Sequence, residues 1–125
     1  MSAIGTALRL HLISAGVSTP IHPTRAPQEA TPPYIVYAVR TNIDHDLTGP
    51  SGLAFSDITY AVHAETHPAA RTIASTLENT LDALTGVVQG TKIAVVLHQS
   101  TDDSGVDEAD SHPIFIIAFR VIWYP

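Results

Sequence analysis

Two stretches of the chain repeat apolar residues every three or four positions, which is the spacing of an amphipathic helix. The first covers residues 3–15 (AIGTALRLHLISA) and is followed by Gly16, a residue that commonly ends helices. The second begins at Pro68, which suits the first turn of a helix, and continues to Leu84, with Gly86 as the expected C-terminal cap. The pattern therefore predicts two helices, and it is more regular in the second.

Four other stretches are rich in β-branched, aliphatic and aromatic residues and predict strands. They cover residues 34–43, 54–65, 91–100 and 114–124. The first two are separated by a segment of Asp, Gly, Pro and Ser residues at 44–52, which predicts the loop of a long hairpin. The last stretch, IFIIAFRVIWY, is almost entirely apolar, which is typical of a strand buried on both faces or covered on one face by a partner.

Two segments lack the composition of a buried element. Residues 18–33 hold five of the nine prolines and predict an extended connector, with a short edge strand near Ile21–His22. Residues 101–112 hold five acidic residues and predict a solvated loop. The order of helix, strands, helix and strands indicates a single α+β domain over residues 1–125. We expect an antiparallel sheet of about four to five strands with two helices packed on one face.

Composition narrows the classes of function. A chain of 125 residues with 45% hydrophobic residues can build a core without covalent staples, and the absence of cysteine excludes disulfides, thiolate metal sites and cysteine nucleophiles. No apolar run reaches the roughly 20 residues that a membrane helix requires, and we expect no signal peptide. The formal net charge is −6 and the six basic residues are scattered, which disfavours sequence-specific binding of nucleic acid.

Seven histidines raise the question of a metal site or a catalytic site. His63 and His67 are four residues apart, but they flank a predicted strand-to-helix junction and lack the glutamate of an HExxH motif. The acidic segment lacks the ligand spacing of a calcium loop, and no nucleophile elbow or phosphate-binding glycine loop occurs. We therefore expect no catalytic residue, no metal and no cofactor. The alternative is a cytosolic small-molecule-binding or enzymatic α+β oligomer that uses His63, His67 or His98 in a pocket between subunits.

The order of several phrases resembles the small tail-completion proteins of long-tailed bacteriophages over nearly the whole chain. Each phrase is ordinary turn or strand chemistry by itself, and their order and spacing carry the resemblance. The phrases are Ala7–Leu8–Arg9–Leu10, Ala26–Pro27, Pro33–Tyr34–Ile35–Val36–Tyr37, Leu47–Thr48–Gly49–Pro50–Ser51–Gly52–Leu53, the alanine-rich helix from Ala69 to Leu84, and Phe119–Arg120–Val121–Ile122–Trp123–Tyr124.

This resemblance implies a virion protein of the tail or neck that is made in the host cytoplasm and acts as a structural subunit. It implies a homo-oligomeric ring, expected to be a hexamer, seated between the tail tube protein and the head connector or stopper protein. Genomic DNA would pass through the ring without sequence-specific binding, and no membrane would be involved. A head-completion or stopper protein of the neck is the alternative within the same class of particles.

A ring built from one kind of chain needs two different contact patches on each subunit. We expect the apolar strand 114–124 and the hairpin 34–65 to carry the ring and tube contacts. The expected contact residues are Tyr34, Tyr37, Leu47, Leu53, Phe119, Ile122, Trp123 and Tyr124. The acidic segment is expected to line the DNA channel and repel phosphates, through Asp102, Asp103, Asp107, Glu108 and Asp110.

Overall fold

The computed structural model describes residues 3–24, 31–46, 49–106 and 112–124, and the structural statements below concern these residues. Two helices and a six-stranded sheet with the order β1-β2-β3-β6-β5-β4 make up the fold. All neighbouring strands are antiparallel except β1 and β2. In chain order the elements are α1 (Ala3–Ser14), β1 (Ile21–Pro23), β2 (Tyr34–Asp46), β3 (Gly49–His63), α2 (His67–Leu81), β4 (Gly86–Val88), β5 (Thr91–Val106) and β6 (Pro113–Tyr124).

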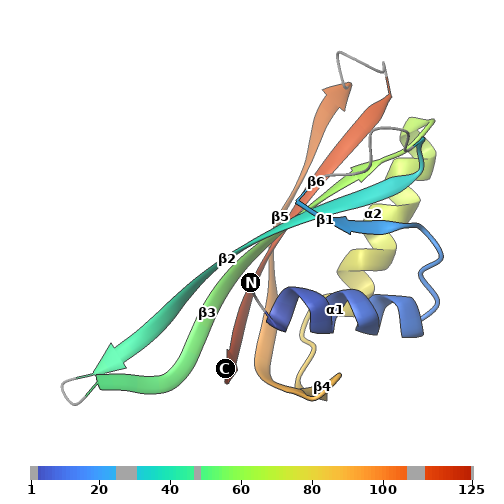
Figure 1. Ribbon diagram of the computed structural model, residues 1–125. Helices are drawn as coiled ribbons and strands as arrows, with labels where there is room; N and C mark the ends of the chain where they lie inside the picture. Colours follow the sequence, from blue (N-terminus) through green and yellow to red (C-terminus); the bar gives the residue numbers. More distant parts are fainter. Residues whose placement is uncertain (1–2, 25–30, 47–48, 107–111, 125) are drawn as a thin grey trace.

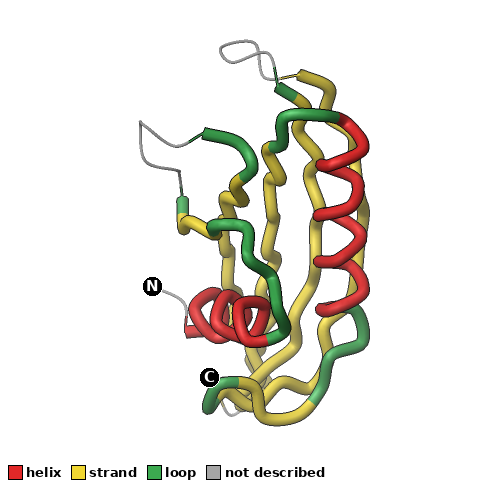
Figure 2. Tube along the Cα trace, turned by 90° about the vertical axis from the view of Figure 1, so that its right-hand side faces the viewer, coloured by secondary structure: helices red, strands yellow, loops and turns green. Residues whose placement is uncertain are grey.

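Both helices pack on the same face of the twisted sheet, as Figure 1 shows on its right-hand side and Figure 2 shows face-on. This confirms the predicted α+β class and the placement of the helices. The predicted short edge strand near Ile21–His22 is β1. The sheet has six strands instead of four to five, because the three-residue strand β4 extends its other edge. None of the helices in the described part of the chain is long and apolar enough to span a membrane.

The hydrophobic core lies between this sheet face and the two helices. The central strands β3 and β6 contribute more of its side chains than the other strands do, and each helix contributes one apolar stripe. Because alternate residues of a strand point to opposite faces, every second residue of β6 enters the core. The core includes Ile4, Leu8 and Leu12 of α1, Ala70, Ala74, Leu77 and Leu81 of α2, Ile58, Tyr60 and Val62 of β3, and Phe115, Ile117, Phe119, Val121 and Trp123 of β6.

Helix α2 starts at His67, one residue before the predicted start at Pro68, and ends earlier than predicted. Thr66 caps its N-terminus, with the side-chain oxygen accepting a hydrogen bond from Ala69 N at 3.3 Å. The helix ends at Leu81, whereas the prediction was Leu84. The helix ends there because the following residues form backbone hydrogen bonds with β5. Ala83 N donates to Val96 O at 2.8 Å, and Val96 N donates to Leu84 O at 3.0 Å. The residue expected as a cap, Gly86, instead opens β4 with a φ of 97°.

Strand pairing continues into both predicted loops, so the predicted loop boundaries were wrong. Strands β2 and β3 stay paired as far as Asp46 and Gly49, and β5 stays paired with β6 as far as Val106. Each ladder contains register shifts, one in the first hairpin and three in the second. A bulge inserts an unpaired residue into a ladder without ending it, so polar and glycine-containing segments can continue as strand although the apolar alternation is lost.

One core residue carries a testable stability effect. Tyr60 is fully buried, and no hydrogen-bond partner for its hydroxyl lies among the described residues. Burial, with a smaller contribution from nearby Tyr37, raises the pKa of Tyr60 above its ordinary value of 10.0. The folded state therefore holds the phenolic proton more tightly than the unfolded state. The resulting stability is complete below pH 10 and is lost as pH rises toward the folded-state pKa.

We therefore expect Tyr60→Phe to raise the free energy of unfolding by about 1 kcal/mol near neutral pH, because it removes a desolvated, unpaired hydroxyl. The advantage should widen at about pH 11, where wild type loses stability and the variant does not. Urea unfolding followed by circular dichroism at both pH values measures this difference. Tyr124→Phe, at an exposed tyrosine, is the control and should change stability little. A Tyr60→Phe variant less stable than wild type at both pH values would contradict the account.

Candidate functional site

The face of the sheet opposite the helices, here called the outer face, carries no described element of this chain (Figure 1). Its side chains form rows across neighbouring strands, since directly paired residues point to the same side. One row joins Phe55, Ile122 and Val95 on β3, β6 and β5. The apolar residues of the outer face are Val36, Ala38, Phe55, Ala61, Val87, Val95, Leu97, Ile114, Ile116, Ala118, Ile122 and Tyr124.

Exposure shows that this apolar surface is open. Val87 is 73% exposed, Tyr124 42% and Leu97 41%. Lys92 lies between Val87 and Tyr124 in the ladder, and its ammonium sits 4.8 Å from the centre of the Tyr124 ring. Contiguous exposed apolar surface of this kind marks a contact with another molecule more often than it occurs by accident.

A row of charged side chains crosses the middle of the outer face. Arg120 Nε donates to Asp57 Oδ1 at 3.0 Å, and Arg40 pairs with Asp57 in the neighbouring ladder. The hydrogen bond and the charge of Asp57 raise the pKa of Arg120. Such an exposed ion pair adds little to the stability of the monomer. Charged groups within an apolar surface can set the alignment of a binding partner.

Aromatic and histidine side chains gather where the outer face meets the start of β6. Tyr34 stacks on His63 with ring centres 4.5 Å apart, and His63 Nδ1 lies 2.7 Å from His112 Nε2. One of these two nitrogens must carry the proton and the other must accept it, so at least one imidazole is neutral in this geometry. His112 is only 5% exposed, and this cluster closes one end of the outer face.

Two other histidines fasten α2 to β5. His67 Nε2 lies 2.5 Å from Asp103 Oδ2, and His98 Nε2 lies 2.7 Å from Thr101 Oγ1. Thr101 also donates to Glu78 of α2. The group of His98, Thr101 and Glu78 differs from a nucleophilic triad, in which the acid binds the second imidazole nitrogen and orients the ring. Here the carboxylate and the imidazole bind the same hydroxyl, so the arrangement holds the helix on the sheet.

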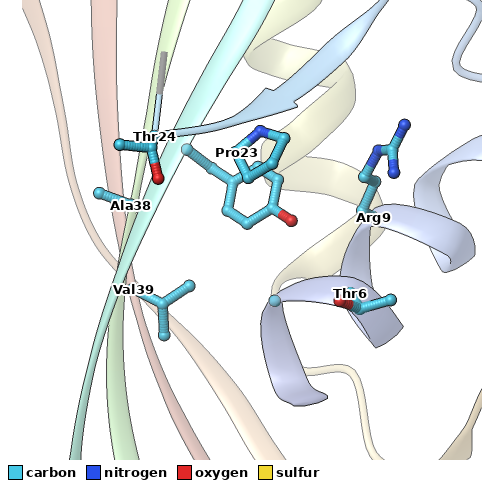
Figure 3. Close-up of a pocket in the computed structure, with 8 residues that line it drawn as sticks. Thr6, Arg9, Pro23, Thr24, Ala38 and Val39 are labelled. Carbon is cyan, nitrogen blue, oxygen red and sulfur yellow. The ribbon is translucent and has the colours of Figure 1, made fainter. Parts of the chain in front are cut away.

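Within one copy of the chain, the three histidines of the alternative interpretation do not come together in one site. His63, His67 and His98 contact different partners, and no group of three or more metal-binding side chains occurs among the described residues. A cavity of about 280 Å³ lies between α1 and the edge of β2, and none of these histidines lines it (Figure 3). Its lining residues are Gly5, Thr6, Arg9, Pro23, Thr24, Tyr37, Ala38 and Val39.

The predicted contact residues divide between core and surface. Tyr37, Phe119 and Trp123 are buried in the core of their own chain, where Trp123 Nε1 donates to Ser56 Oγ at 2.8 Å. Leu53 and Ile122 are half-buried, Tyr124 is exposed, and Tyr34 is enclosed by the histidine cluster. Leu47 lies outside the described residues. The sequence prediction missed Phe55, Val95 and Leu97 of the outer face, although the alternation of the predicted second strand around Ile58 already placed Phe55 opposite the core.

Of the predicted channel-lining residues, the structure describes two. Asp102 and Asp103 belong to β5 and are exposed, so they are not part of a solvated loop as predicted. The side chain of Asp103 is bound to His67 on the helix side of the sheet. Asp107, Glu108 and Asp110 lie outside the described residues, and their place in a channel stays a prediction.

Comparison with known proteins identifies a structure of the same fold. No protein-family model matches the chain, and no curated protein matches it in sequence. The chain is similar to a chain in the structure described as the virion of a native gene transfer agent particle, with a TM-score of 0.74 and 16% sequence identity. The similarity covers 100% of both chains. At this identity it establishes a shared fold over the full length.

Proposed function

We propose that the chain is a structural virion protein that forms a homo-oligomeric ring at the head-proximal end of a phage tail. In this role it caps the tail tube and joins it to the head connector. The observation that carries the proposal is the apolar outer face, which no described element of the chain covers. The similarity in fold to a chain from a gene transfer agent virion and the resemblance of the sequence to tail-completion proteins support it.

The energetics favour a partner on the outer face. Fully burying one large apolar side chain is worth about 1.5–3 kcal/mol, and this face presents several in adjacent rows. A single copy leaves Val87, Leu97 and Tyr124 substantially exposed to water. Repeated association of identical subunits removes this surface from water in every copy at once. The charged row around Asp57 then supplies alignment within an otherwise apolar contact.

The shape of the sheet gives such a subunit two further directions of contact. The β2–β3 hairpin extends well beyond the helix layer at one end, and the β5–β6 hairpin extends at the other end (Figure 1). In the proposed ring, one hairpin reaches toward the tail tube and the other toward the head connector. A stopper protein of the neck would use the same surfaces against the connector alone, and this is the second candidate role.

Polymerisation of the tail tube protein in the presence of the chain tests the proposal. We expect negative-stain images to show shorter tubes that carry a ring of the chain at one end only. A mock-treated sample gives the tube length without the cap. Tubes of unchanged length with no bound chain would contradict the tail-capping role, and binding to purified head connectors under the same conditions would then favour the stopper role.

A further inference from the structure

We propose that copies of this chain join edge to edge, with the exposed half of β2 in one copy pairing with the exposed half of β5 in the next. The inference rests on the proposed ring and names a second contact between its subunits, in addition to the contact on the outer face. Its basis is that the sheet has two open edges whose geometry and charge match each other. Backbone pairing across such edges extends a sheet from one chain to another.

The first open edge belongs to β2. Strand β1 pairs only with Ile35–Tyr37, and no described strand lies along the rest of that edge. Ile35 N donates to Pro20 O and Thr24 N donates to Tyr37 O, each at 2.8 Å, so the backbone groups of Ile35 and Tyr37 point outward from the sheet. The two-residue repeat of a strand directs the backbone groups of Val39 in the same direction.

The second open edge belongs to β5. Strand β4 pairs only with Thr91–Ile93, and hydrogen bonds from the segment after α2 cover the edge as far as His98. The last of these is donated by His98 N to Asp82 Oδ1 at 3.1 Å. From Gln99 onward the described part of the chain places no strand beside this edge.

The two open edges fit each other in direction and position. Strands β2 and β5 run antiparallel within the sheet, and each is covered at its N-terminal half, by β1 and by β4. The open halves therefore lie at diagonally opposite corners. A second copy, shifted along the strand direction, would pair its β5 with the open half of β2 in the first copy. Its β5 would then lie in line with β1 of the first copy, and its β4 would lie beyond the end of β2 of the first copy. In a closed ring this stagger requires strands tilted to the ring axis, as in any closed barrel.

Charge on the two edges is complementary on both faces of the sheet. Beside the β2 edge, Arg40 lies on the outer face, and Arg9 lies on the helix side with a buried Nε that has no hydrogen-bond partner among the described residues. On β5, Asp102 lies on the outer face and Asp103 on the helix side. The cavity at the end of β1 lies between Arg9 and Val39, where the incoming strand would pass (Figure 3).

Engineered cysteines test the contact directly, because the chain has no cysteine of its own. Ala38→Cys and Ser100→Cys place one thiol on each open edge, both on exposed outer-face positions. With a short bis-maleimide cross-linker, we expect a ladder of covalent oligomers that ends at the ring size. Ala38→Cys with Thr59→Cys, a directly paired position on β3, should cross-link within one chain only. Ala38→Cys with Ser75→Cys on exposed α2 should give neither product.

A charge exchange supplies an independent test. Arg40→Asp alone and Asp102→Arg alone should each raise the concentration needed for ring assembly at least tenfold. The double variant should regain most of the loss, because each interface then again holds opposite charges. Two results together would overturn the edge contact and leave the proposed function intact. The rings would form without cross-linking at the edges, and the concentration needed for ring assembly would be the same in the charge variants as in wild type. Absence of any ring, with or without tube protein, would overturn the proposed function itself.

Discussion

Replacing Phe119 with alanine should lower the free energy of unfolding by about 3–5 kcal/mol. Phe119 is 1% exposed and lies at the centre of β6, with its ring 5.8 Å from that of Tyr60 and 5.4 Å from that of His98. The substitution removes a large apolar side chain and leaves a cavity that the paired strands around it cannot close. Because a domain of this size is stable by only about 5–15 kcal/mol, the variant should retain little of its stability.

Urea unfolding followed by circular dichroism measures this loss. Phe55→Ala is the matched control, since Phe55 is an aromatic residue on the neighbouring strand that lies half-buried on the outer face. We expect Phe55→Ala to cost the monomer about 1 kcal/mol, because only part of the Phe55 surface is removed from water in one copy. Equal losses at the two positions would contradict the assignment of an inner and an outer face.

Replacing Ile122 with aspartate should abolish ring assembly while leaving the monomer folded. Ile122 sits between Phe55 and Val95 in the outer-face row, on the side of the sheet away from the core. In the monomer the new carboxylate can reach water. In an assembled ring it would be enclosed by a partner without a counter-charge, at a cost of several kcal/mol, or more than a hundredfold in affinity.

Size-exclusion chromatography across a concentration series, with circular dichroism as the check on folding, measures this effect. Ile122→Val keeps an apolar side chain at the same position and should assemble nearly as well as wild type. Ser75→Asp adds the same charge on the exposed side of α2 and should also assemble. Normal assembly by Ile122→Asp would show that the partner does not cover this part of the outer face.

The regular part of the fold was predictable because its apolar periodicity is strong. The helix over residues 3–15 corresponds to α1, and the run 114–124 corresponds to β6, whose alternate residues enter the core. Strand β4 escaped prediction because Gly86–Val88 is too short to show a pattern. The length of β5 escaped because three register shifts break its alternation, so its polar C-terminal half resembles a loop.

The candidate site was only partly predictable. The apolar composition of 114–124 indicated burial of both faces, but composition cannot distinguish a covering helix of the same chain from a second chain. Only the three-dimensional arrangement shows that both helices lie on one side of the sheet (Figures 1 and 2). Aromatic character also misled the selection of contact residues, since Phe119 and Trp123 are core residues while Ile122 faces outward. The contact of His63 with His112 joins residues far apart in sequence and leaves no local signal.

The mass of the purified chain in solution, alone and with tail tube protein, tests the central claim most directly. The subunit mass is 13.3 kDa. Native mass spectrometry should show one closed assembly at an integer multiple of this mass, expected to be a hexamer, with few smaller species. The tube protein should increase the population of this assembly without changing the number of copies. A monomer that persists at every concentration, with the tube protein present as well as absent, would contradict the ring.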